Sequence, residues 1–279
     1  YVATGYHLFG KQDWSVRGAC QCPAGEVDIR MALARSANDF FWEIATRPGM
    51  GGAANGIDVL ADYARRLGFG QPTGIDFPEF AGTVPDKDWK LRTLGEPWYP
   101  GETMDVAIGQ GYLTVTPLQI AVAYMAVANR GVAYVPRLVS RIESASGEII
   151  KTFPPVSRTI DIGSEYWEPI VEGLRLVIQS PRGTAYQSRR WEDDTPWGAE
   201  AWYDPAGKTG SAQRAPDEDA HAWFAGFAPA SDPEIVVVVY VEEGGGGGSA
   251  AAPIARRVMD RYFARENAGT ADASASSGS

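Results

Sequence analysis

Apolar residues at three- and four-residue spacing predict helices over much of the chain. The clearest pattern covers residues 57–67, where the apolar positions form one stripe and Gly68 marks the end. Asp28 begins a second such segment, and Pro48 stops a third. The remaining helices are predicted by the same criteria, so that the full set is residues 27–34, 39–47, 57–67, 117–128, 165–179 and 254–265.

The segment at residues 117–128 differs from the others because it is apolar all round. Thr116 stands at the N-cap position, Pro117 at the first helical position and Gly131 just past the end. We therefore expect an interior helix here. By contrast, residues 71–100 are rich in Pro, Gly and Trp without periodicity, which predicts a long ordered excursion.

Strand patterns dominate the last third of the chain. Residues 207–213, 220–228 and 234–242 are spaced as an antiparallel meander, and the Val content of the last strand predicts a central or well-shielded position. Two further strands are expected earlier, at residues 134–142 and 148–153, around a Ser-Gly turn.

The Gly-rich residues 244–253 read as a flexible approach to the final helix. The overall prediction is an α+β fold, with a mostly helical half followed by an antiparallel sheet closed by the C-terminal helix. We assign residues 1–266 to this domain and the small, polar residues 267–279 to a disordered tail.

Composition and charge narrow the classes of function. Asp and Glu number 35 against 25 Lys and Arg, so the formal charge is -10 and the chain offers no basic surface for nucleic acid. No stretch approaches the roughly 20 apolar residues that a membrane-spanning helix needs. The chain begins at Tyr1 rather than Met, and we expect a preceding segment in the whole protein.

Two apparent nucleotide motifs fail on context. The Gly-Lys-Thr-Gly string at residues 207–210 lacks the earlier glycine of a phosphate loop, since position 202 is Trp. The Gly-x-Gly-x-x-Ala string at residues 49–54 follows a predicted helix, whereas a dinucleotide-binding loop follows a strand. We therefore predict no cofactor.

Two triplets remain, Ser36-Ala-Asn38 between two predicted helices and Lys208-Thr-Gly210 at the start of a strand. Such triplets accompany a Ser-x-x-Lys nucleophile in penicillin-binding proteins and serine β-lactamases. Their surroundings strengthen the match, and the strings that carry it are Pro97-Trp-Tyr-Pro-Gly101, Ile108-Gly-Gln-Gly-Tyr112, Thr116-Pro-Leu-Gln119, Ala128-Asn-Arg-Gly-Val132, Pro181-Arg-Gly-Thr-Ala185, Lys208-Thr-Gly-Ser-Ala-Gln213, His221-Ala-Trp-Phe-Ala-Gly-Phe-Ala-Pro229 and residues 247–253. From about Gly5 to Phe263, the chain resembles the transpeptidase domain of class B penicillin-binding proteins, and is most similar to the elongation-specific penicillin-binding protein 2 group.

The resemblance implies a D,D-transpeptidase that cross-links peptidoglycan stem peptides and is trapped by β-lactams. It implies a location at the extracytoplasmic face of the bacterial membrane, with a membrane glycosyltransferase and elongation-complex proteins as partners. In the catalytic roles that it implies, Ser36 relays a proton, Asn38 holds the peptide amide, and Lys208 supplies positive charge where anion develops.

The strand that follows Lys208 is implied to bind substrate. The hydroxyls of Thr209 and Ser211 would take its terminal carboxylate, while the backbone of residues 208–213, including Gly210 and Gln213, would pair with it as an added strand. The backbone N–H of Ser211 would also contribute to the oxyanion hole.

One departure from the family is clear: no serine of this chain is followed three residues later by a lysine. We expect the nucleophile upstream of Tyr1, and we expect these 279 residues alone to be inactive and poorly folded, because a core helix would be missing. Two alternatives stay open: a hydrolase of the same fold, meaning a serine β-lactamase or D,D-carboxypeptidase, and a non-catalytic binding protein.

Several residues also have purely structural interpretations. Ser36 and Asn38 are typical helix-capping residues, and His221 lies among hydrophobic strand residues, which favours a packing role. Some relatives have a zinc-binding arrangement before the Ser-x-Asn helix. His7, Asp13, Cys20 and Cys22 fall in that region, but their spacing matches no recognised zinc finger, and we assign no metal site.

Overall fold

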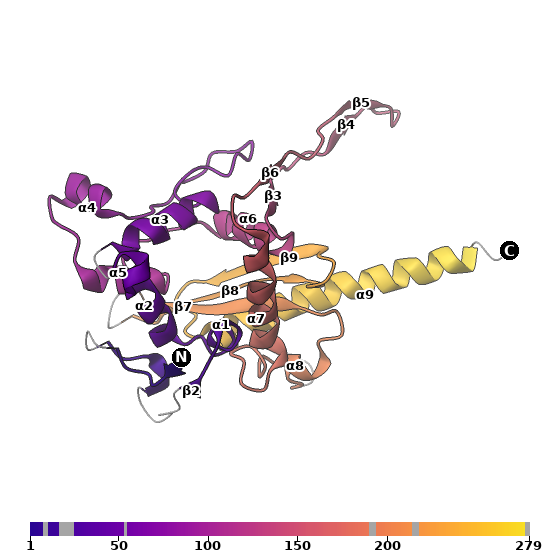
Figure 1. Ribbon diagram of the computed structural model, residues 1–279. Helices are drawn as coiled ribbons and strands as arrows, with labels where there is room; N and C mark the ends of the chain where they lie inside the picture. Colours follow the sequence, from indigo (N-terminus) through magenta and orange to yellow (C-terminus); the bar gives the residue numbers. More distant parts are fainter. Residues whose placement is uncertain (8–10, 17–24, 53–54, 190–193, 214–217, 277–279) are drawn as a thin grey trace. The chain divides into compact units, whose positions relative to one another are not determined.

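The computed structural model describes residues 1–7, 11–16, 25–52, 55–189, 194–213 and 218–276. The chain divides into two compact units. Unit 1 comprises Tyr1–Glu26 and Ala37–Glu168, and unit 2 comprises Val27–Ser36 and Pro169–Ser279. Figure 1 follows the chain through the elements of both units, from indigo at the N-terminus to yellow at the C-terminus.

Unit 1 is mainly helical, and α5 packs against both α2 and α3. Its helical elements are η1 (Trp14–Val16), α2 (Asn38–Thr46), η2 (Pro48–Met50), α3 (Gly56–Arg66), α4 (Lys87–Leu94), α5 (Pro100–Ala107), α6 (Pro117–Ala128) and η3 (Ser164–Tyr166). Helix α4 lies inside the segment that the sequence pattern assigned to an aperiodic excursion. Its N-cap Asp86 accepts a hydrogen bond of 2.6 Å from the Trp89 N–H. A helix of eight residues is too short for periodicity to reveal, so capping is the only local signal.

The interior helix was predicted correctly. The hydroxyl of Thr116 accepts a bond from the Gln119 N–H, while the Gln119 side chain accepts one from the Thr116 N–H. This reciprocal cap satisfies two backbone donors at the start of α6. The buried residues that pack together beyond it are Val122, Ala126, Ala133, Ile160 and Trp167.

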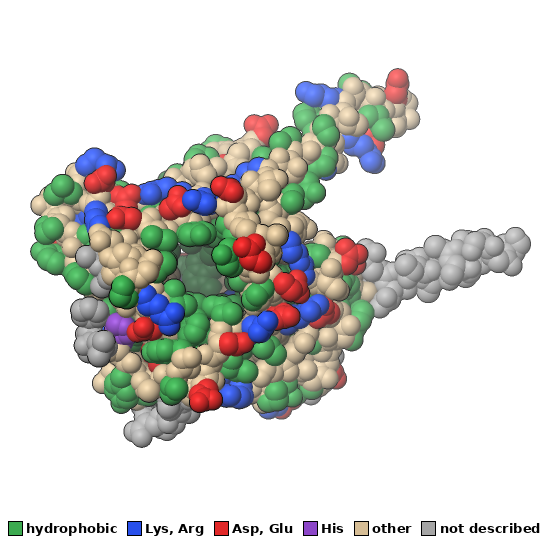
Figure 2. Space-filling view, in the orientation of Figure 1, with side chains coloured by type: hydrophobic (Ala, Val, Ile, Leu, Met, Phe, Trp, Pro, Cys, Tyr) green, Lys and Arg blue, Asp and Glu red, His purple; other side chains and the backbone are tan. Residues whose placement is uncertain are grey.

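Among the described residues, the strands of unit 1 form three small antiparallel pairs. They are β1 (Val2–Ala3) with β2 (Gly25–Glu26), β3 (Val132–Tyr134) with β6 (Ser157–Thr159), and β4 (Arg141–Glu143) with β5 (Ile149–Thr152). The predicted strand at residues 134–142 is therefore wrong, because it joins the end of β3 to the start of β4, which belong to different sheets, across Pro136. The sequence pattern also missed β6. Proline cannot donate to a strand ladder, which separates the two pairings. The β4–β5 hairpin is exposed along its length and carries apolar side chains among charged ones (Figure 2).

Unit 2 is built on a three-stranded antiparallel sheet in the order β7 (Ala206–Ala212), β8 (His221–Ala228), β9 (Ile235–Val241). The meander was predicted correctly, but the central strand is β8, and β9 lies at an edge among the described residues. A Val-rich sequence pattern indicates that the side chains of a strand are shielded on both faces. It does not indicate whether the backbone of that strand pairs on one side or on both, so it cannot distinguish an edge strand from a central one.

Helices complete unit 2: α1 (Ile29–Arg35), α7 (Trp167–Gln179), which begins at the end of unit 1, α8 (Trp197–Glu200) and α9 (Ala252–Ser276). Helix α9 packs against β8 and β9. The buried core here comprises Val177, Ile178, Ala185, Trp197, Tyr203, Ala222, Phe224, Ala228, Val237, Ala251, Ala252, Ala255, Met259 and Phe263. The predicted α+β architecture is confirmed.

The C-terminal part differs from the expected elements in two places. Helix α9 continues to Ser276, past the expected end at Arg265. Extending an existing helix avoids the unfavourable nucleation step, so even a small, polar sequence can continue one. The Gly-rich approach to α9 contains the π-helical turn η4 (Gly247–Ala251), which packs against β7 and β8. Among the described residues, no helix is both long enough and apolar enough to span a bilayer.

Candidate active site

Lys208 and Ser36 meet in unit 2, although 172 positions separate them in the chain. The Lys208 Nζ donates a 2.7 Å hydrogen bond to the Ser36 Oγ and a second bond of 2.8 Å to the Thr209 carbonyl. Lys208 lies on β7, and Ser36 is the residue that ends α1. The structure therefore pairs one residue from each triplet that the sequence pattern singled out.

Local structure places Ser36 at that point. Asp28 caps α1 by accepting a 2.9 Å bond from the Met31 N–H, and the helix ends at Ser36, whose backbone is left-handed with φ 52°. A left-handed residue commonly ends a helix, although it is uncommon for a residue other than Gly, Asn or Asp. The last turn of α1 is also tied to the rest of unit 2, because the Thr184 N–H donates to the Ala34 carbonyl.

The ionisation of Lys208 is perturbed by its surroundings. Burial of the ammonium group lowers the pKa of Lys208 from its ordinary value of 10.5 to about 8. At pH 7 roughly a tenth of the side chain is then neutral. A lysine in this range can both hold a positive charge near an anion and exchange a proton with a hydroxyl, which suits acyl transfer.

The residues after Lys208 form the edge strand β7, whose outer side pairs with no strand among the described residues. The Thr209 hydroxyl lies 2.7 Å from the Thr184 hydroxyl, and the exposed Ser211 accepts a 3.1 Å bond from the Gly247 N–H. A side chain at Gly210 would press on Trp223, its cross-strand partner on β8. Gln213 follows the last residue of β7, one position beyond the observed strand.

Asn38 belongs to unit 1, where it is the first residue of α2. Its backbone N–H donates a 2.6 Å bond to the buried Asp13 carboxylate, so Asp13 serves as the cap that the start of α2 requires. The structure thus gives Asp13 a structural role. The predicted contribution of the Asn38 side chain to substrate binding remains a proposal.

Two other sequence hypotheses have different outcomes. His221 begins β8, its Nδ1 accepts a 3.0 Å bond from the Glu243 N–H, and its ring contacts Tyr240, in agreement with a packing role. The zinc hypothesis depends on Cys20 and Cys22, which lie outside the described residues. Within the described ranges, no three His, Cys, Asp or Glu side chains are grouped as a metal site.

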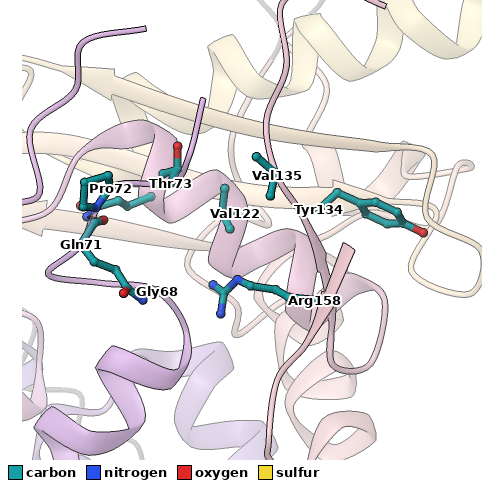
Figure 3. A pocket seen from close by; sticks show the side chains of 9 residues that line it. Gly68, Gln71, Pro72, Thr73, Val122, Tyr134, Val135 and Arg158 are labelled. Carbon is teal, nitrogen blue, oxygen red and sulfur yellow. Dashed lines mark hydrogen bonds between the residues drawn. The ribbon is translucent and has the colours of Figure 1, made fainter. Parts of the chain in front are cut away.

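Unit 1 contains a cavity of about 200 Å³ between the end of α3, the following loop, α6, β3 and β6 (Figure 3). The Arg158 side chain lies at its wall, where it donates to the Arg66 and Leu67 carbonyls at the C-terminus of α3. None of the predicted site residues lines this cavity, whose lining residues are Gly68, Gln71, Pro72, Thr73, Gln119, Val122, Tyr134, Val135 and Arg158.

Sequence reasoning missed Thr184 and Gly247 as neighbours of the predicted binding strand. Both stand in strings that carry the family resemblance, yet neither string indicates a role for its residues. Only pairing across the fold reveals that Thr184 contacts Thr209 and that Gly247 contacts Ser211.

Known proteins match most of this chain. The family model for the penicillin binding protein transpeptidase domain matches residues 5–260. The peptidoglycan D,D-transpeptidase MrdA of Haemophilus influenzae is 34% identical over 269 residues, which cover 90% of this chain and 38% of the relative. The chain therefore spans about two fifths of the length of that relative.

Solved structures give the same result. A peptidoglycan synthase complex, described as coordinating polymerization and crosslinking, contains a chain that is 32% identical, with a TM-score of 0.79 over 95% of this chain and 42% of that one. PBP2 of Helicobacter pylori, solved in complex with MreC, is 25% identical, with a TM-score of 0.71 over 94% of this chain and 45% of that one.

Proposed function

Because this chain belongs to the penicillin-binding protein transpeptidase family, we propose that it is part of a D,D-transpeptidase that cross-links peptidoglycan stem peptides through a serine acyl-enzyme. The single observation that carries the proposal is the 2.7 Å bond between Lys208 and Ser36, with the pKa of Lys208 lowered to about 8. Ser36 and Lys208 belong to two separate triplets. A purely structural role for either triplet would not require these two side chains to contact each other.

The nucleophile is proposed to lie in a segment of the whole protein that precedes Tyr1, since no serine of this chain has a lysine three residues later. In this mechanism a neighbouring base takes the proton of the nucleophilic hydroxyl while its oxygen attacks the carbonyl of a D-Ala-D-Ala end, and the base returns that proton when the acyl-enzyme is cleaved. The leaving amine needs a second proton. Ser36 and Lys208 form a pair that can deliver that proton, because a hydroxyl both donates and accepts. Lys208 then recovers the proton when an acceptor amine attacks the acyl-enzyme.

The free edge of β7 is proposed to bind the substrate backbone as an added strand. Thr209 and Ser211 lie along this strand, and their hydroxyls are proposed to take the terminal carboxylate. The same edge would hold a β-lactam, whose carboxylate and acyl amide mimic those of the peptide. Asn38, Gly210 and Gln213 retain the binding roles that the family resemblance implies.

The environment of the whole protein follows from its relatives. By analogy with the Helicobacter pylori protein bound to MreC and with the peptidoglycan synthase complex, we propose an elongation-complex protein and a glycosyltransferase as partners. Peptidoglycan is assembled outside the bacterial cytoplasmic membrane, and we place the protein at that face.

Acylation of the complete protein by fluorescent penicillin tests the proposal. Lys208→Ala should slow acylation by about 100-fold or more, the scale of losing one preorganised electrostatic contact. Lys151→Ala, which removes an exposed lysine of β5, is the matched control and should react at the wild-type rate. A wild-type rate in Lys208→Ala would remove this lysine from the mechanism.

The same experiment separates the alternatives. Label that remains attached to the protein argues against a serine β-lactamase, whereas steady turnover of penicillin would indicate one. No labelling of the wild-type protein would indicate a non-catalytic binding protein. A peptide map with penicillin attached to Ser36 or Ser211 would show that the nucleophile lies within this chain.

A further inference from the structure

The hydroxyl of Ser211 is oriented by a backbone donor. The Gly247 N–H donates to the Ser211 Oγ over 3.1 Å, so one lone pair of that oxygen is occupied. A hydroxyl that accepts a bond from a fixed donor turns its own hydrogen away from that donor. Ser211 is exposed on the edge strand β7, and its hydrogen is therefore available to an anion bound along that edge.

The position of the donor depends on η4, whose two glycines, Gly247 and Gly248, lie too close to neighbouring backbone to carry a side chain. A Cβ on Gly247 would stand 2.3 Å from the Gly210 carbonyl oxygen and 2.5 Å from that of Trp223. A Cβ on Gly248 would stand 2.5 Å from the Thr184 carbonyl oxygen. Gly247 and Gly248 therefore pack directly on neighbouring backbone, and a shift of η4 away from β7 would lengthen the 3.1 Å bond to Ser211.

Ser188 fixes the position of η4. Its hydroxyl donates a 2.7 Å bond to the Gly248 carbonyl, and the side chain is only 4% exposed. A partly buried carbonyl that loses such a donor is only incompletely compensated by water, which favours rearrangement of the turn. Ser188 is thus linked to Ser211 through two consecutive residues of η4.

Arg256 of α9 fixes Ser188 in turn. It is fully buried, its guanidinium donates a 3.2 Å bond to the Ser188 carbonyl, and it also binds the Thr195 carbonyl and the Glu200 carboxylate. The Ser188 N–H donates to the Ala185 carbonyl. Both sides of the Ser188 backbone are therefore held, which directs its hydroxyl at η4.

We propose that Ser188 is a positioning residue that acts through η4 to orient the Ser211 hydroxyl toward the carboxylate of the substrate. The inference rests on the proposed function, because it requires that β7 bind a carboxylate. It assigns to the buried Ser188 an effect on substrate charge, although Ser188 itself does not touch the substrate. A merely structural role would lower acylation by every substrate alike.

The test compares benzylpenicillin with its methyl ester, which lacks the negative charge. The second-order rate constant of acylation is measured on the complete protein by competition with fluorescent penicillin. Ser188→Ala should slow acylation by benzylpenicillin about 10-fold or more, the effect of weakening one hydrogen bond to a charged group, and should slow the ester by less than about threefold. Ser188→Thr retains the hydroxyl and should restore the preference for the acid.

Two further variants make the result specific. Ser249→Ala removes an exposed hydroxyl of the same turn, which donates to the Gly246 carbonyl, and should keep the wild-type preference. If Ser188 acts through Ser211, the double variant Ser188→Ala, Ser211→Ala should discriminate acid from ester no less than Ser211→Ala alone.

Equal slowing of acid and ester by Ser188→Ala, or additive losses of discrimination in the double variant, would overturn the inference and leave the proposed function intact. A wild-type protein that no penicillin acylates would overturn both. Melting curves identify any variant that fails to fold. If Ser188→Ala fails to fold, Ser188→Thr is compared with wild type instead. A lost preference for the acid in Ser188→Thr overturns the inference, and a retained preference supports it.

Discussion

Replacing Lys208 with Met should make the stability of the domain less dependent on pH. Met is close to Lys in length and shape but cannot carry a charge. In the folded protein, burial lowers the pKa of Lys208 to about 8, whereas the unfolded chain has the ordinary value of 10.5. Below pH 8 the folded state must therefore hold an ammonium that is more stable in the unfolded state.

The sign and size of the effect follow from this difference in pKa. The difference between 10.5 and about 8 corresponds to about 3 kcal/mol, at 1.36 kcal/mol per pKa unit. This free energy destabilises the folded state at any pH at which Lys208 is protonated in both the folded and the unfolded state. Between pH 8 and 10.5 the unfolded state binds a proton that the folded state has lost, so stability rises with pH. From pH 7 to pH 10 the wild-type protein should gain roughly 2.5 kcal/mol relative to Lys208→Met.

Urea denaturation of the complete protein, followed by Trp fluorescence of the transpeptidase domain, measures this gain. The quantity of interest is the difference between variant and wild type at each pH, because the other titrating groups cancel in it. Lys151→Met provides a control on an exposed lysine and should show a constant difference. If the difference for Lys208→Met also stays constant within about 0.5 kcal/mol from pH 7 to 10, the lysine is not destabilised by burial, and the reasoning fails.

Three other substitutions test contacts of the fold. Gly247→Ala should lower the free energy of unfolding by about 1 to 3 kcal/mol, because the new Cβ meets backbone atoms that cannot give way. In the same urea titration, the control Gly101→Ala on α5 should be close to neutral, because the space around Gly101 is open. Arg158→Met removes a charged donor from two carbonyls in the last turn of α3. The substitution should therefore lower the stability of unit 1 by about 1 to 3 kcal/mol and speed amide hydrogen exchange in that turn. Unchanged exchange would contradict this. Tyr203→Phe should destabilise unit 2 by about 1 to 3 kcal/mol in thermal melts, because the Tyr203 hydroxyl joins the Trp197 indole to Asp260, and an unaltered melting temperature would show that this bridge is dispensable.

Elements with strong local signals were predictable from the sequence. Asp28 and Thr116 cap α1 and α6 as their positions indicated, because a capping side chain bonds to backbone groups within three residues. The meander of β7, β8 and β9 was equally accessible, since alternating burial and short turns are properties of neighbouring residues. The two triplets and the strings around them carried the family resemblance, and the resemblance implied acyl transfer.

Partners far apart in the chain were not predictable. The pairing of β3 with β6 and the edge position of β9 depend on which backbone edges meet, and side-chain patterns do not record that. Glycines at residues 244–248 indicated flexibility, whereas the close approach of η4 to Gly210 and Trp223 makes Gly247 a packing residue. The triplets alone did not show that Lys208 lies 2.7 Å from Ser36 or that its pKa falls to about 8. Both depend on burial and on distances between distant segments, which exist only once the chain has folded.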